Sequence, residues 1–161
     1  RLMLPDFEPV VVPFDRILEA IQNEAADAGL VIHEAQLTYG RSGYHNVVDL
    51  GRWWKDTYNL PLPLGANVLR RDLHPEVARE SCRLMRESIQ YALDNHEEAL
   101  TYALQFARDM DQRLAEKFVG MYVNHYTLDA GTVVPQAAQK LLDLGHEAGL
   151  IPHRVQVEFV G

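Results

Sequence analysis

The sequence predicts an α/β fold that gives way to a mainly helical region after Leu73. Short apolar runs bounded by proline or glycine occur at residues 7–14 and 30–32, which is typical of strands. After Leu73 the apolar residues recur every three or four positions, the spacing of one helix face. We therefore expect an α/β lobe, incomplete at its N-terminus, over residues 1–65, followed by a crossing segment and C-terminal helical region over residues 66–161.

The first expected elements are a strand and a helix. Residues 7–14 (FEPVVVPF) hold a β-branched run bracketed by prolines, which suits a short strand better than a helix. Asp15 is a good N-cap residue, and Gly29 is a good helix stop. Between them, apolar residues recur at helical spacing: Ile17, Leu18, Ile21 and Ala25.

A second strand is expected directly after this glycine. Residues 30–32 form a continuous apolar run, as in a buried parallel strand, and the run ends in the ionisable pair His33 and Glu34. Open α/β sheets bind their ligands at the carboxyl ends of strands. The pair therefore occupies a position where a site is expected.

The next stretch mixes short elements. We expect a loop or short helix over residues 37–43, a short strand over residues 46–50 (NVVDL) and a helical turn over residues 51–58. Residues 60–65 (LPLPLG) contain prolines that force extended backbone on the residues before them, so they predict a rigid crossing segment.

The rest of the chain predicts a series of helices. The face of the first is formed by Ala78, Cys82, Met85, Ile89 and Ala92. Further helices are expected to start near Asn95 and at Asp111, and a last one to run from Pro135 to Gly149, closed by Pro152.

Composition limits the classes of function. A formal charge of −8 and a pI near 5.3 argue against nucleic-acid binding, which depends on clustered basic residues. No apolar run approaches the roughly 20 residues that cross a bilayer, and no signal-peptide core is visible, so no membrane partner is expected. The single cysteine, Cys82, forms no internal disulfide and fits a reducing compartment, so we expect a cytoplasmic protein.

His33 is the candidate base. An imidazole with an ordinary pKa near 6.5 can accept and return a proton at neutral pH. The alternative is a histidine that caps a strand and bonds to backbone, and spacing alone leaves both open. The other histidines show no HExxH or cysteine-paired pattern, so no metal site is expected.

The tryptophan pair and Arg70 each allow a functional and a structural interpretation. Trp53 and Trp54 can form an aromatic wall for a flat ligand, but adjacent tryptophans on a short amphipathic turn more often anchor it to the core. Arg70 can grip a substrate carboxylate, or it can form an ion pair with Asp72 or Glu76. No phosphate loop or Ser/His/Asp signature is present.

Three blocks in order carry a resemblance to a known family: residues 29–39 (GLVIHEAQLTY), 47–54 (VVDLGRWW) and 60–73 (LPLPLGANVLRRDL). The chain resembles the C-terminal portion of the 1,4-dihydroxy-6-naphthoate synthases, enzymes of the futalosine route to menaquinone. Residues 91–102 and 122–131 look like the same family. Asn67 departs from it, standing where an aliphatic residue is expected, and its role is open.

The resemblance implies a periplasmic-binding-protein-like (type II) two-lobed fold, of which this chain holds most of the second lobe and the C-terminal helices. It implies a lyase without metal or cofactor that splits a three-carbon fragment from a small-molecule substrate, cyclic dehypoxanthinyl futalosine. His33, in the family's IHE block, is then the catalytic base. Glu34 points to the opposite side of a regular strand, so its role is open.

Alternatives within the same fold are a chorismate dehydratase-like enzyme, whose family lacks the IHE block, and a solute-binding module in which His33 only hydrogen-bonds a ligand. Arg1 begins the chain in what resembles the last turn of a helix, so we expect a fragment. Its sheet would lack a central strand, and most substrate contacts would lie in an absent N-terminal lobe. The expected partner is therefore that lobe, or a strand swapped from a second copy.

Overall fold

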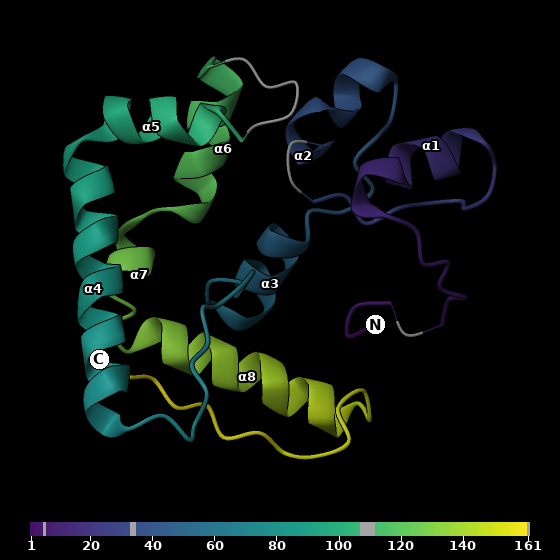
Figure 1. Cartoon of the computed structure of the whole chain (residues 1–161). Helices are drawn as coiled ribbons and strands as arrows, with labels where there is room; N and C mark the ends of the chain where they lie inside the picture. Colours follow the sequence, from purple (N-terminus) through teal and green to yellow (C-terminus); the bar gives the residue numbers. More distant parts are fainter. Residues whose placement is uncertain (5, 33–34, 107–111, 161) are drawn as a thin grey trace. The chain divides into compact units, whose positions relative to one another are not determined.

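A computed structural model of the chain describes residues 1–4, 6–32, 35–106 and 112–160. The chain folds as two compact units, Arg1–Val48 and Asp49–Gly161 (Figure 1). The division between residues 65 and 66 that the sequence suggested stays a prediction. Within the second unit, the crossing segment is bonded to the helix before it. Trp54 Nε1 donates a hydrogen bond of 3.0 Å to the carbonyl oxygen of Pro61.

The first unit contains short helices. They are η1 (Phe14–Arg16), α1 (Ile17–Gln22), α2 (Ala35–Thr38) and η2 (Tyr39–Ser42). The last two fall on residues 37–43, where a loop or a short helix was expected, and the short helix is the alternative found.

The helix expected between Asp15 and Gly29 ends early, at Gln22. Glu24 takes a left-handed conformation with φ of 58°, and the amides of Glu24 and Ala25 bond back to the carbonyls of Ile21 and Ala20. This pattern is a Schellman motif, in which a left-handed residue satisfies the last carbonyls of a helix. The prediction failed because glutamate gives no signal for that conformation.

The strands expected at residues 7–14, 30–32 and 46–50 do not appear among the described residues. A strand is stabilised by backbone hydrogen bonds to a neighbour, and the first two segments have no such neighbour in the described part of the chain. Their side chains are open to solvent, with Val11 95% and Leu30 65% exposed. In the third segment Asp49 accepts a hydrogen bond from the amide of Arg52 and so starts a helix instead.

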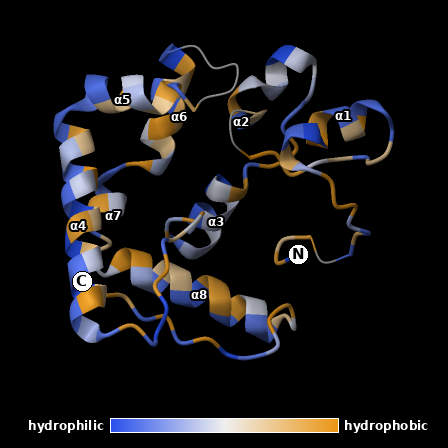
Figure 2. Cartoon of the chain, viewed as in Figure 1, coloured by the Kyte–Doolittle hydropathy of each residue, from blue (hydrophilic) through white to orange (hydrophobic). Residues whose placement is uncertain are grey.

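The second unit is a set of helices, as expected for the region after Leu73. They are α3 (Leu50–Tyr58), α4 (Pro75–Asp94), α5 (His96–Leu104), α6 (Gln112–Tyr122), α7 (His125–Leu128) and α8 (Val133–Glu147). Figure 2 shows that hydrophilic residues dominate α4, whereas α8 is largely hydrophobic. The described core is small, with Trp54, Leu100, Ala115 and Ala137 as its buried hydrophobic residues.

Side-chain caps mark the starts of α3, α4 and α7. His74 accepts a hydrogen bond from the amide of Glu76, and Pro75 occupies the first turn, so α4 begins where proline is tolerated. Asn95 precedes α5, as predicted, and α8 begins two residues before the expected Pro135. The expected start of α6, Asp111, lies outside the described residues, although α6 itself is present from Gln112.

Candidate functional site

The predicted base, His33, and its neighbour Glu34 lie outside the residues that the structure describes. The structure does describe the chain on either side of them, residues 28–32 before and α2 after. The candidate site is therefore built from the contacts that hold these flanking segments.

Gly29 holds the segment before the site against α1. A Cβ atom at this position would lie 2.4 Å from Ile17 Cγ2 and 3.0 Å from Ile21 Cδ1. Real side-chain carbons do not approach so closely, so the absence of a side chain lets residues 28–32 pass directly over α1. Gly29 was predicted as a helix stop, but its structural role is this close approach.

Tyr44 holds the segment after the site against the same helix. Its hydroxyl donates a hydrogen bond of 2.9 Å to the carbonyl oxygen of Leu18 in α1, in a partly buried position. Gly43, just before it, has φ of 80°, a left-handed conformation that lets the chain turn after η2. Gly29 and Tyr44 thus fix both ends of the stretch that contains His33 to α1.

The tryptophan pair confirms the anchoring alternative. Trp54 is fully buried with 0% exposure, and its ring lies 4.5 Å from that of Tyr58 between centroids. Its indole nitrogen bonds to Pro61, so α3 fixes the start of the crossing segment. Trp53 is half-buried and packs edge-on against Tyr58.

The extended stretch of residues 60–73, called the crossing segment from here on, ends in arginines that form ion pairs. Arg70 binds Asp72 through two hydrogen bonds, one of them 2.9 Å from Nε to Oδ1. Of the two roles considered for Arg70, the structure therefore shows the ion pair with Asp72 and not an arginine available to bind a substrate carboxylate. Arg71 Nη1 lies 2.7 Å from Glu158 Oε2, and this hydrogen bond raises the pKa of Arg71 above its usual value. The side chain of Asn67 is exposed.

The described histidines either contact nearby groups of the fold or are exposed to solvent. His74 caps α4, His96 Nε2 lies 3.6 Å from Glu116 Oε1, and His146 Nδ1 lies 3.0 Å from the carbonyl oxygen of Ile151. His45, His125 and His153 are exposed. No group of three or more His, Cys, Asp or Glu side chains that could hold a metal ion occurs in the described part of the chain.

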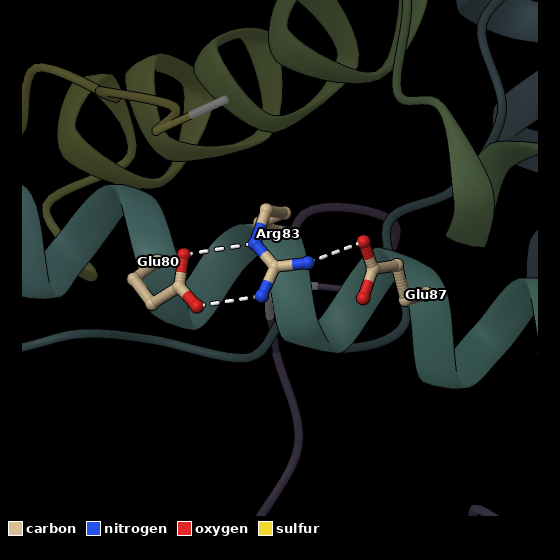
Figure 3. A network of polar contacts seen from close by, with 3 residues as sticks. All are labelled: Glu80, Arg83 and Glu87. Carbon is tan, nitrogen blue, oxygen red and sulfur yellow. Dashed lines mark hydrogen bonds and ion pairs between the residues drawn. The ribbon is translucent and has the colours of Figure 1, made fainter.

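The densest charged cluster stabilises a helix. On α4, Arg83 donates hydrogen bonds of 2.8 and 2.6 Å to both carboxylate oxygens of Glu80 and a further one to Glu87 (Figure 3). The bond from Arg83 lowers the pKa of Glu80. These residues are three and four positions apart, the spacing at which side chains meet on a helix surface, so the cluster supports α4 rather than a site.

Among the residues that the structure describes, no helix is long and apolar enough to cross a membrane.

Comparison with known proteins gives a consistent result. A family model described as menaquinone biosynthesis matches residues 1–147. The chain is 39% identical over 145 residues to a 1,4-dihydroxy-6-naphthoate synthase of Streptomyces coelicolor, covering 90% of this chain and 51% of that protein. It is 41% identical over 144 residues to the synthase of the same name from Thermus thermophilus, covering 89% and 53%.

A crystal structure of an Archaeoglobus fulgidus protein is also similar. The TM-score is 0.88 at 48% sequence identity, and the match covers 93% of this chain and 57% of that one. The chain thus spans about half the length of the curated relatives and somewhat more than half of this solved chain.

Proposed function

This chain belongs to the menaquinone-biosynthesis family, and on that premise we propose that it acts as part of a 1,4-dihydroxy-6-naphthoate synthase. The observation that carries the proposal is the identity of 39% and 41% to two proteins of that name across about nine-tenths of the chain. The family match covers residues 1–147 and so includes His33.

The proposed reaction is a carbon–carbon cleavage of cyclic dehypoxanthinyl futalosine. A neutral imidazole at His33 takes a hydroxyl proton from the substrate, and the oxygen electron pair forms a carbonyl as the carbon–carbon bond to a three-carbon fragment breaks. The carbon that keeps the electrons of that bond takes the proton back from the imidazolium, and aromatisation of the remaining ring favours the product. Such a step needs a base held in place and a site closed to water. The contacts of Gly29 and Tyr44 with α1 support the first requirement, because they anchor the chain on both sides of His33.

We also propose that the chain contributes most of the second lobe and the C-terminal helices to a two-lobed, periplasmic-binding-protein-like fold with the ligand between the lobes. The exposed apolar residues of the expected strand segments support this, since Val11 and Leu30 would be covered by neighbouring strands in such a sheet. A relative roughly twice as long leaves room for the second lobe.

The test is direct. The intact native protein is incubated with cyclic dehypoxanthinyl futalosine, and the dihydroxynaphthoate product is followed by its absorbance. Product formation without added cofactor is the expected result. Saturable binding of the substrate without any product would favour the solute-binding alternative, and dehydration of chorismate in its place would favour the chorismate dehydratase-like alternative.

A further inference from the structure

The C-terminal segment after α8 turns back and runs antiparallel along that helix (Figure 1). The turn is closed by Gly149, with φ of 69°, and by the amides of Leu150 and Ile151, which both bond to the carbonyl oxygen of Gly145. Gly145 allows the return, because a Cβ atom there would lie 2.8 Å from Ile151 Cδ1. From this turn onward, the segment contacts α8 at positions progressively closer to the start of the helix.

Gln139 holds this segment through its backbone. Its side-chain oxygen accepts a hydrogen bond of 2.9 Å from the amide of Val157, and its side-chain nitrogen donates one of 2.9 Å to the carbonyl oxygen of Val155. The side-chain amide of Gln139 thus pairs with the backbone N–H of Val157 and the backbone carbonyl of Val155, groups that a neighbouring strand would otherwise pair with. A third bond, of 3.1 Å to Asp143, orients the amide, and Asp143 in turn lies 3.5 Å from Arg154.

The far end of the segment reaches the crossing segment. Glu158, next to Val157, forms the 2.7 Å ion pair with Arg71. Residues 60–73 have no helix or strand. They are tied to the rest of the second unit at one end by Pro61 with Trp54 and at the other by Arg71 with Glu158. Both residues of the ion pair are largely exposed, at 72% and 61%, so the pair holds Arg71 only while Glu158 itself is fixed.

We propose that residues 154–158 form a strap, clasped to α8 by Gln139, that positions the crossing segment for substrate binding. Gln139 is a positioning residue in this account, because it acts through Glu158 and Arg71 and not on the substrate. The catalytic part of this inference rests on the proposed function, within which we assign the crossing segment to the substrate site. The mechanical part does not depend on it.

Limited trypsin digestion of the intact native protein tests the mechanical part, since Arg70 and Arg71 are exposed cleavage sites outside any helix. Gln139→Leu should speed cleavage after Arg71 by at least about threefold, because the strap opens locally. The control is Gln136→Leu, an exposed position of the same helix. Fragments are identified by mass spectrometry, with cleavage after Arg52 in α3 as the internal reference.

A second variant, Glu158→Ala, leaves the clasp intact and removes the acceptor for Arg71, so it should also speed cleavage after Arg71 and keep the fold unchanged. In turnover assays, Gln139→Leu should raise KM at least about threefold and change kcat by less than about twofold. Equal acceleration in the Gln136→Leu control, or no acceleration in Gln139→Leu and Glu158→Ala, would overturn the strap. The proteolysis results test the strap independently of synthase activity.

Discussion

The hydroxyl of Tyr44 donates a hydrogen bond to the carbonyl oxygen of Leu18, although 26 residues separate them in sequence. The bond closes the stretch of chain that contains His33 against α1. Together with the close approach of Gly29 to Ile17, it makes α1 the support of the candidate site.

Tyr44→Phe should therefore destabilise the first unit. The variant keeps the ring but leaves the partly buried carbonyl of Leu18 without this donor, so we expect a loss of about 1 kcal/mol in the free energy of unfolding. Chemical denaturation measures the loss, and synthase turnover should fall with it. Tyr126→Phe, at an exposed tyrosine, is the control. Equal stability of both variants would show that the bond does not support the site.

Gly29→Ala should be destabilising by about 1 to 3 kcal/mol, since the added carbon overlaps Ile17 and must displace it. The matched control is Gly120→Ala, where nothing lies within 4 Å of the added carbon. In α6 that change should stabilise the protein by up to about 1 kcal/mol, because alanine favours helix. Thermal unfolding of the two variants should shift in opposite directions, and a shift in the same direction would contradict the packing described.

Trp54 should be the most sensitive position of the second unit. Trp54→Ala removes a fully buried ring, and we expect a loss of about 3 to 5 kcal/mol. Trp54→Phe keeps much of the packing and loses the bond to Pro61, so it should cost less. Trp53→Phe serves as the comparison, and an equal effect of Trp53→Phe and Trp54→Phe on the unfolding midpoint would argue against the bond to Pro61.

The pH dependence of turnover should follow a base that works in its neutral form. An imidazole has an ordinary pKa near 6.5, so kcat/KM should be constant above that pH and fall as the pH is lowered through it. The assay is run between pH 5 and 8 in buffers of constant ionic strength. A flat profile over this range would count against histidine as the base.

Most helices of the second unit could be predicted because their signals are local. The apolar face from Ala78 to Ala92, the start near Asn95 and the helix expected from Pro135 agree with α4, α5 and α8 to within a few residues. The short helix α7 was missed, although Asn124 and Thr127 form a capping box whose spacing was readable. The strands expected in the first unit could not be predicted from local signals alone, because a strand also depends on hydrogen bonds to a neighbouring strand.

The candidate site shows the same contrast. The sequence allowed Arg70 either to bind a substrate carboxylate or to form an ion pair, and the structure shows the ion pair with Asp72. Gln139 gave no signal at all, since a glutamine on a helix is ordinary until the chain returns beside it. His33 was reached through its position after an apolar run and through the family resemblance, and its role as a base stays a prediction.

The most direct test of the account compares His33→Asn with His45→Asn in the intact native protein. His45 is an exposed histidine of the same unit, so it controls for loss of an imidazole as such. With cyclic dehypoxanthinyl futalosine as substrate, His33→Asn should lower kcat by at least about a hundredfold and leave substrate affinity largely unchanged, while His45→Asn keeps normal turnover. Near-normal turnover in His33→Asn would contradict the assignment of His33 as the catalytic base.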